Sequence, residues 1–248
     1  MSQRVLILGA TSAIAAEVAS LYAARGARLH LVGRSHDKMQ ALLARLGRAD
    51  HITHQLADFT QLEGAEGIVA SSFEALGGVD VALIAHGDLG DQLESEQSAS
   101  AAAATLSANF VSAVALLVPL ANRLERAKGG VIGVITSVAG ERGRPRNYTY
   151  GAAKAGLNIY LQGLRSRLFA ANVRVVTLKL GPVDTPMTVG HAKNALFAQP
   201  ARVAASIVRA LEGHASEAYV PWFWAVIMPI VRNTPERLFQ LLPFLSGR

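Results

Sequence analysis

The chain has 248 residues, of which 51% are hydrophobic and only 17% are charged, and its formal net charge is +6. This composition excludes a disordered chain, because disorder requires low hydrophobicity and high charge. Cysteine is absent, which excludes a disulfide framework, a thiolate metal site and a cysteine nucleophile, and we predict no metal site.

Apolar runs of strand length alternate with longer helical patterns along the whole chain. The predicted strands are Arg4–Leu8, Arg28–Val32, His51–Leu56, Val79–Ala85, Val131–Thr136, Val173–Leu180 and Ala218–Val220. The predicted helices are Ile14–Arg25, His36–Leu46, Leu62–Leu76, Ala99–Arg126, Tyr150–Ala170 and Pro200–Glu212. The strands are almost continuously apolar, which is typical of strands buried on both faces of a parallel sheet. The pattern predicts a three-layer α/β fold with a doubly wound, mostly parallel sheet and a single domain over residues 1–248.

Charge is distributed unevenly between the two halves. Residues 1–124 carry a net charge of −4 and residues 125–248 a net charge of +10. This asymmetry predicts an anionic partner for the second half. The arginines are scattered among apolar helices, so we expect an anionic small substrate or an anionic membrane surface and no nucleic acid. The start MSQRVLILGA is too short in apolar residues for a secretory signal, and no run of about 18 apolar residues predicts a spanning helix, so we expect a cytoplasmic protein.

The first candidate site follows the first predicted strand. A strand, a glycine and a helix that begins near Ile14 present backbone N–H groups and the positive helix end to a pyrophosphate. The candidate cofactor-binding residues of this turn are Gly9, Thr11, Ser12, Ala13 and Ile14. An ordinary turn with Thr11 or Ser12 as N-cap would have the same pattern.

The end of the second strand bears on the choice of cofactor. A dinucleotide fold places the adenosine ribose there, where an acid would bind the 2′-hydroxyl and an arginine would bind a 2′-phosphate. Arg34 follows Val32 closely and no acid takes its place. This favours NADP(H) over NAD(H), unless Arg34 is a solvated loop residue.

A tyrosine and a lysine four residues apart form the most informative pattern. Tyr150 and Lys154 share one face of a predicted helix, and Ser137 ends the fifth strand, where catalytic groups of parallel sheets gather. Tyrosine has an ordinary pKa of about 10, which is too high for proton transfer near neutral pH. We expect the Lys154 ammonium to lower the pKa of Tyr150 by about one to three units. Tyr150 would then exchange a proton with a carbonyl oxygen that Ser137 holds.

Several short segments together resemble the signatures of the short-chain dehydrogenase/reductase family, over almost the whole chain. They are Gly9–Ala15, Asp58, Asn109, Ser137, Tyr150 with Lys154, and Leu180–Thr185. The resemblance implies a seven-stranded Rossmann sheet, an NAD(P) cofactor and an Asn-Ser-Tyr-Lys tetrad. It also implies a homodimer or homotetramer in which the two long helices pair between subunits.

The resemblance further assigns roles to individual residues. Asn109 would anchor a water-linked proton relay through Lys154, which would also hold the ribose hydroxyls beside the nicotinamide. Asp58 would contact the adenine ring. Val183 and Thr185 would hold the nicotinamide carboxamide.

Some positions depart from the family pattern. Ala13 and Ala15 stand where the family has glycines, and the methyl of Ala13 is expected to weaken cofactor binding. His86 follows the fourth strand, where it either touches the cofactor or is structural or solvated. A non-catalytic dinucleotide-binding subunit is therefore an alternative, although such proteins usually lose the Tyr or the Lys.

Three arginines alternate between Ser137 and Tyr150. In an extended segment, Arg142, Arg144 and Arg146 would point to one side, beside the active centre. Arginine binds phosphate in a bidentate manner, so these residues are candidates for an anionic substrate. A solvated loop or a set of salt bridges between subunits is the alternative.

Residues 219–248 form an aromatic, proline-containing hydrophobic C-terminal extension. Its aromatic residues are Tyr219, Trp222, Phe223, Trp224, Phe239 and Phe244. Such a segment can lie in a membrane interface or line a groove for a lipid chain. It can equally pack on the protein's own core or on a second subunit.

The loop and the extension resemble those of reductases that act on decaprenylphosphoryl-2-keto-pentose. That resemblance implies reduction of a keto sugar carried on a polyprenyl phosphate, with peripheral membrane contact through the extension. The wider expectation is an NAD(P)H-dependent oxidoreductase that interconverts a ketone and a secondary alcohol. A general carbonyl or 3-oxoacyl reductase is the alternative within the enzymes.

Overall fold

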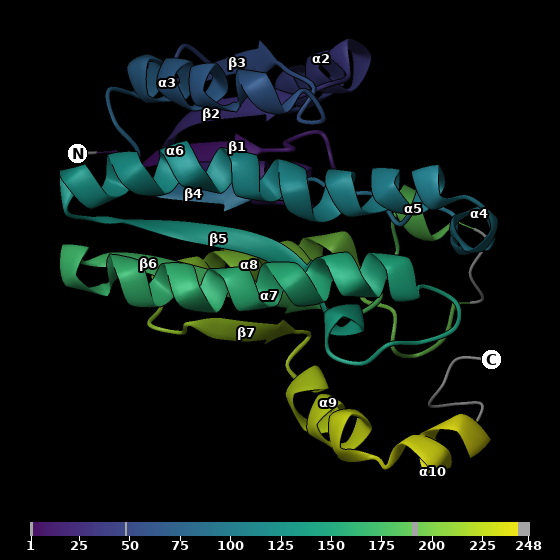
Figure 1. Ribbon diagram of the computed structural model, residues 1–248. Coiled ribbons are helices and arrows are strands. Elements are labelled where there is room, and N and C mark those ends of the chain that lie inside the picture. Colours follow the sequence, from purple (N-terminus) through teal and green to yellow (C-terminus); the bar gives the residue numbers. More distant parts are fainter. Residues whose placement is uncertain (1, 48, 190–192, 243–248) are drawn as a thin grey trace.

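Seven strands, all paired in parallel, form one sheet in the computed structural model, which describes residues 2–47, 49–189 and 193–242 (Figure 1). The strands are β1 (Arg4–Leu8), β2 (Arg28–Gly33), β3 (Ile52–Leu56), β4 (Val81–Ile84), β5 (Gly130–Ser137), β6 (Val173–Leu180) and β7 (Glu217–Val220). Their order is β3-β2-β1-β4-β5-β6-β7. The chain therefore runs to one edge, returns to the centre and runs to the other edge, as in a doubly wound sheet. The predicted fold class is confirmed.

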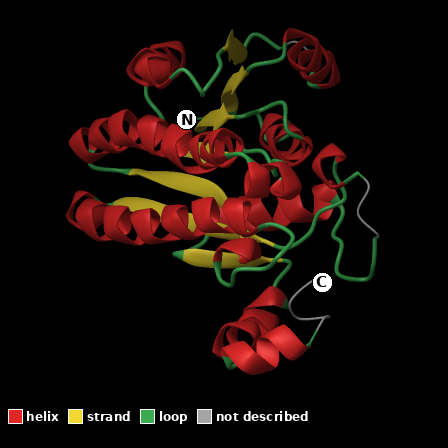
Figure 2. Ribbon diagram, turned by 45° about the vertical axis from the view of Figure 1, so that its right-hand side comes forward, coloured by secondary structure: helices red, strands yellow, loops and turns green. Residues whose placement is uncertain are grey.

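Helices cover both faces of the sheet and its carboxyl-terminal edge (Figure 2). They are α1 (Ala13–Ala23), α2 (His36–Arg45), α3 (Ala65–Leu76), α4 (Gln92–Gln97), α5 (Ala99–Leu106), α6 (Ser112–Ala127), α7 (Tyr148–Leu168), α8 (Pro200–Glu212), α9 (Trp224–Asn233) and α10 (Glu236–Leu241). The core on one face contains residues of three helices: Val18 of α1, Leu42 of α2 and Ile207 of α8. The core on the other face contains Leu116 of α6 and Leu161 of α7, and these two helices pack there with α3. Burial on both faces explains why the strand sequences are so uniformly apolar.

The long helix predicted over Ala99–Arg126 is interrupted. A π-helical turn, Ser107–Val111, separates α5 from α6. The stretch Ala99–Ala127 reaches a mean hydropathy of 1.9, enough by length and composition to cross a bilayer, although the core helix of a soluble protein passes the same test. Leu116 and Leu120 of this stretch are fully buried in the core beside the sheet. We therefore interpret it as a helix that flanks the sheet.

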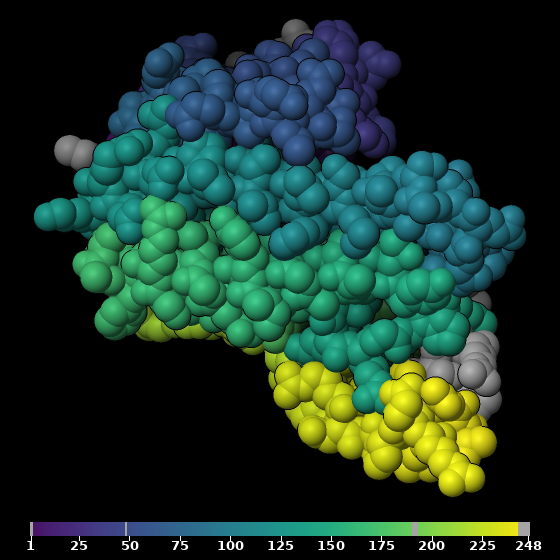
Figure 3. Space-filling view, in the orientation of Figure 1, coloured from purple at the N-terminus to yellow at the C-terminus, as the bar shows by residue number. Residues whose placement is uncertain are grey.

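The C-terminal extension predicted over residues 219–248 contains two helices that the sequence reading missed. Tyr219 and Val220 belong to β7, and α9 and α10 then form a lobe beyond that strand (Figure 3). Trp224, Met228 and Phe239 are buried against Val138, the residue after Ser137. The described part of the extension thus packs on the chain's own core beside the catalytic strand end. Phe244, with the rest of residues 243–248, lies outside the described residues.

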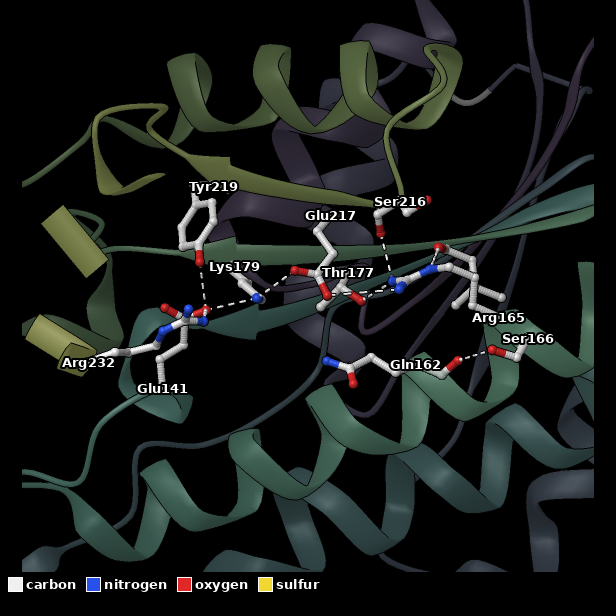
Figure 4. Close-up of polar contacts among 11 residues, drawn as sticks. Glu141, Gln162, Arg165, Ser166, Thr177, Lys179, Ser216, Glu217, Tyr219 and Arg232 are labelled. Carbon is white, nitrogen blue, oxygen red and sulfur yellow. Dashed lines mark hydrogen bonds and ion pairs between the residues drawn. The ribbon is translucent and has the colours of Figure 1, made fainter. Parts of the chain in front are cut away.

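A buried network of charges fastens this lobe to the sheet (Figure 4). Lys179 of β6 pairs with Glu141 at 2.8 Å and with Glu217 at 2.7 Å. Tyr219 donates its hydroxyl to Glu141 at 2.7 Å, and Arg232 of α9 lies 3.9 Å from the same carboxylate. Burial alone would lower the pKa of Lys179, but hydrogen bonds with the two glutamates raise it above its ordinary value. A buried lysine with two acidic partners keeps its charge, so β6, β7, α9 and the loop after β5 are joined electrostatically.

We predict that Glu141→Ala lowers the free energy of unfolding by about 3 kcal/mol, because it removes one partner of a buried ion pair. The side chain of Glu141 is only 4% exposed. The control is Glu212→Ala, which removes a surface partner of Arg25 and should cost less than about 1 kcal/mol. Urea unfolding followed by tryptophan fluorescence measures both values. Equal losses in the two variants would contradict a structural role for the network.

Candidate active site

The turn after β1 has the geometry of a phosphate-binding turn. Gly9 has a φ of +88°, and a Cβ at this position would lie 2.6 Å from the backbone nitrogen of His86. No other residue fits this close approach without strain. Ser12 caps α1 by accepting from the Ala15 N–H at 3.2 Å. The first N–H groups of α1, from Ala13 and Ile14, have no acceptor within a helix by position, and they face the carboxyl-terminal edge of the sheet.

The ends of β2 and β3 bring Arg34 and Asp58 together. Arg34 is exposed directly after β2, and Ser35 caps α2. Asp58 accepts from the backbone and the hydroxyl of Thr60, and these hydrogen bonds, with a smaller effect of Arg34, lower the pKa of its carboxyl. Both residues thus lie at the same end of neighbouring strands as the first turn. Their roles toward the adenosine half of a cofactor stay predictions.

The π turn holds Asn109 in the site. Asn109 is 1% exposed, and its side-chain amide donates to the carbonyls of Asp88 and Thr105 at 2.6 and 2.9 Å. Its side-chain oxygen accepts from the Asp88 N–H at 3.1 Å. Asn109 therefore clamps the loop after β4, and a π turn is a frequent feature of functional sites.

Ser137, Tyr150 and Lys154 meet where β5 ends. A Cβ on Gly140 would lie 2.7 Å from the carbonyl carbon of Lys154, and one on Gly151 would lie 2.8 Å from the Ala139 carbonyl oxygen. The turn after β5 thus rests on the backbone of α7. The Nζ of Lys154 lies 5.5 Å from the centroid of the Tyr150 ring. The spacing argument that placed Tyr150 and Lys154 on one helix face is confirmed.

The prediction that the Lys154 ammonium lowers the pKa of Tyr150 below its ordinary value is wrong. Burial raises the pKa of Tyr150 to about 12, and a hydrogen bond with Ser137 only partly opposes it. Burial also lowers the pKa of Lys154 to about 8. Lys154 is 3% exposed and donates to the Ile135 carbonyl at a long 3.4 Å. Burial thus disfavours the charged form of both groups, and it is the largest cause of each shift.

The segment after β6 carries Val183 and Thr185. Val183 is buried and pairs with Ala198 in an isolated bridge. Thr188 donates its hydroxyl to the Val183 carbonyl and accepts from the Thr185 N–H. The parallel pairing of Ser137 with Leu180 puts this segment at the same edge as the catalytic candidates.

The expectation that three arginines point to one side is wrong. The segment is bent and turned, with the Asn147 N–H donating to the Arg144 carbonyl, so the alternation of an extended strand does not apply. Arg142 turns to α10, where it pairs with Glu236 at 2.6 Å. Arg144 lines a cavity beside α10, and Arg146 is exposed.

His86 lies beside the site, and the sequence alone left its role open. Its Nε2 lies 2.8 Å from the hydroxyl of Ser112, just after the π turn, and its ring centroid lies 4.7 Å from that of Phe59. Burial, and to a smaller degree Lys154, lowers the pKa of His86 to about 3, so the ring is neutral. These contacts make His86 a packing residue between the first turn and α6. The sequence signal for this packing role was a histidine after an apolar strand, at a position where a small residue is expected.

The described residues fit a dinucleotide. The turn at Gly9 has no room for a side chain, which suits a pyrophosphate that approaches the backbone. Within the described part of the chain, the buried Lys154 ammonium has one weak acceptor, so further acceptors such as ribose hydroxyls would satisfy it. The turn at Gly9 and Lys154 are thus suited to hold the two halves of such a cofactor; roles of Thr11 and Ser12 stay predictions.

Comparison with known proteins agrees with this geometry. The family model for short chain dehydrogenases matches residues 3–195. The chain belongs to the short-chain dehydrogenase family. An uncharacterized oxidoreductase of Mycobacterium tuberculosis is 34% identical over 241 residues, which cover 96% of each protein. Enzymes of this family are NAD(P)-dependent oxidoreductases, and the chain is one of them.

Two further similarities support the family. A hydroxysteroid 11-beta-dehydrogenase 1-like protein of Xenopus tropicalis is 30% identical over 228 residues, covering 89% of this chain and 79% of that protein. A short chain dehydrogenase from Burkholderia cenocepacia, crystallised with NADP, has the same fold with a TM-score of 0.83 over 97% of both chains and 19% identity. The Burkholderia structure shows the shared fold, and membership of the family, shown by the family model, implies a nicotinamide dinucleotide as the cofactor.

We predict that kcat/KM for NADPH oxidation falls as the pH rises through about 8. Lys154 has a lowered pKa of about 8 in the free enzyme, so its ammonium is present below that pH and is lost above it. The measurement is a pH profile with a saturating ketone. In Lys154→Arg the charge persists, so any remaining activity should decline only at higher pH. A wild-type profile that is flat to pH 10 would contradict the assignment.

Proposed function

We propose that this short-chain dehydrogenase is an NADP(H)-dependent reductase that interconverts a ketone and a secondary alcohol. Its proposed substrate is a keto sugar carried on a polyprenyl phosphate. The observation that carries the reaction is the contact of the turn at Gly140 with α7, which brings Ser137 next to Tyr150 and Lys154. The likeness to a subgroup of keto-sugar reductases, in the loop and the extension, supports the substrate.

Each reacting side chain has a separate task. A reduced nicotinamide, when bound, would supply the hydride that the carbonyl carbon accepts. Ser137 donates a hydrogen bond to the carbonyl oxygen and orients it, while Tyr150 gives that oxygen a proton. Lys154 stabilises the phenolate that remains and holds the ribose hydroxyls. In this direction one hydride and one proton turn the ketone into the alcohol, and oxidation reverses both transfers.

A high pKa of Tyr150 is compatible with this task. The free phenol holds its proton at neutral pH because its pKa is raised to about 12. In the reductive direction a protonated tyrosine is the form that must be present. Charge that develops on the substrate oxygen, together with the Lys154 ammonium, then assists the proton transfer.

We predict that Tyr150→Phe lowers kcat for ketone reduction by about 10²- to 10⁴-fold, because it removes the proton donor. Binding of NADPH, measured by fluorescence titration, should change little. The control is Tyr160→Phe on the same helix, where the ring packs against the core away from the site. Substantial turnover by Tyr150→Phe would refute the assigned acid.

Preference for NADP(H) is supported by the charge at the end of β2. Arg34 is exposed after β2, and the acid near it, Asp58, is engaged by Thr60. An arginine in this place can receive a 2′-phosphate, whereas an acid would repel it.

We predict that Arg34→Asp shifts the ratio of kcat/KM for NADPH over NADH toward NADH by about 10- to 100-fold, the loss of one or two charged hydrogen bonds. Arg28→Asp, at the opposite end of the same strand, is the matched control and should leave the ratio unchanged. An unchanged ratio in Arg34→Asp would mean that the 2′-phosphate is held elsewhere.

A lipid-linked substrate is supported by the lobe. Trp222, Val226, Ile230, Leu238 and Leu241 are exposed on or beside α9 and α10. Such a surface suits a lipid chain or the interface of an anionic membrane. The name of the Xenopus relative refers to a hydroxysteroid, which is an apolar molecule that carries a hydroxyl. We propose peripheral membrane contact of a cytoplasmic enzyme on the same grounds.

A general carbonyl or 3-oxoacyl reductase would use the same catalytic residues without need of the lobe. NADPH consumption with keto sugars, with and without a polyprenyl phosphate, separates the two functions. Equal kcat/KM for both forms of the sugar would favour the alternative. A non-catalytic subunit would consume no NADPH with any ketone.

A homodimer or homotetramer is also proposed. Val118 of α6 and Ile159 and Phe169 at α7 are large apolar residues exposed on the outer faces of these helices. A second copy of the chain would cover them in an isologous interface.

A further inference from the structure

Two arginines of the loop between β5 and α7 have very different surroundings. Arg142 donates to Glu236 at 2.6 Å and to the Arg232 carbonyl at 3.2 Å, and its guanidinium lies 4.4 Å from the centroid of the Phe239 ring. Arg144 has no hydrogen-bond or ion-pair partner among the residues that the structure describes, and its Nε is buried. Burial lowers the pKa of Arg144. A buried guanidinium nitrogen without an acceptor among the described residues is costly, and an acceptor supplied by a ligand would remove that cost.

Arg144 lines a cavity of about 350 Å³ between the loop and α10. Phe239 and Gln240 of α10 and Tyr148 of α7 also line it. Glu236 is the acid in its wall, but its carboxylate already accepts from Arg142 and from Gln240. Among the residues that the structure describes, Arg144 thus has no counter-ion, and it lies in a partly aromatic cavity.

The cavity lies between the lobe beyond β7 and the loop that follows Ser137. Arg144 lies seven residues after Ser137 and six before Tyr150, and seven residues span at most about 25 Å. Arg34, the candidate for the cofactor phosphate, follows β2 near one edge of the sheet. The lobe with α10 lies beyond β7 at the other edge (Figures 1 and 3). An anion at Arg144 is therefore distinct from the 2′-phosphate of the cofactor.

We propose that Arg144 binds the acidic head of the substrate, a phosphate ester, while Phe239 and Tyr148 contact the apolar part next to it. A guanidinium binds a phosphate through two parallel hydrogen bonds, which suits a single unpaired arginine. The site takes an amphiphilic phosphoester. Arg142 is a structural clamp, and Arg146 is outside the site. The ligand's identity as substrate rests on the proposed reductase function, but the binding itself needs no turnover.

Calorimetric titration with octyl phosphate, without nucleotide, tests the binding. Arg144→Gln should lower the affinity for octyl phosphate about 10- to 100-fold, because it removes charged hydrogen bonds. The matched control is Arg146→Gln, two residues away and exposed, which should change the affinity less than about 2-fold. Equal weakening in the two variants, or wild-type binding of 1-octanol as tight as that of octyl phosphate, overturns the proposal.

A wild-type measurement keeps the test valid if Arg144→Gln does not fold. Octyl phosphate should raise the midpoint of thermal unfolding of the wild-type protein, because a ligand that binds the native state stabilises it. 1-Octanol at the same concentration should not. No upward shift with octyl phosphate overturns the proposal.

Turnover separates this inference from the proposed function. The substrates are a straight-chain ketone with a terminal phosphate and the same ketone with a terminal hydroxyl. Arg144→Gln should raise KM for the phosphate form at least 10-fold and leave kcat/KM for the hydroxyl form within about 2-fold. Equal losses for both forms overturn the inference. If the wild-type protein consumes no NADPH with either ketone, the proposed function fails, while octyl phosphate binding at Arg144 is still decided by the titration.

Discussion

The turn at Ala139 and Gly140 rests directly on the backbone of α7, and the placement of the reacting side chains depends on this contact. A side chain on Gly140 would collide with the main chain at Lys154. The contact locks the end of β5, with Ser137, to the helix that carries Tyr150 and Lys154. Backbone packing thus fixes the positions from which the three side chains project. Such preorganisation is the main structural contribution of a protein to proton transfer.

The same turn also connects the catalytic strand to the C-terminal lobe. Val138 packs against Trp224 and Phe239, and Glu141 is tied to Lys179 and Arg232. The lobe is thus joined to the chemistry by residues next to Ser137. A ligand that binds between the lobe and the loop would therefore contact the same element that carries Ser137.

The fold was predictable because burial on both faces of a parallel sheet leaves a direct mark on the sequence. The predicted strand Val173–Leu180 matches β6 at both ends. The π turn was not predictable, because Ser107–Val111 differs from an α-helix only in hydrogen-bond register. The helices α9 and α10 were missed because three prolines, Pro221, Pro229 and Pro235, suggested a broken segment, yet Pro229 lies inside α9.

Within the site, spacing along a helix predicted which side chains meet but not their pKa values. The pKa of Tyr150 depends on how far tertiary packing removes water, and no local pattern reports that. The alternation of Arg142, Arg144 and Arg146 misled because alternation specifies direction only in an extended backbone. Lys179 could have indicated a buried ion pair from the sequence, because a lysine within an apolar strand needs an acidic partner. The sequence could not show that one such partner is Glu141.

The most direct measurement is a crystal structure of the protein with NADPH and a bound ketone or alcohol. The substrate oxygen should lie about 2.6–3.2 Å from the Tyr150 hydroxyl and from Ser137 Oγ, beside the nicotinamide ring. Lys154 Nζ should have left the Ile135 carbonyl for the ribose hydroxyls. A nicotinamide ring beyond reach of Tyr150, with Lys154 still on Ile135, would contradict Tyr150 as the proton donor.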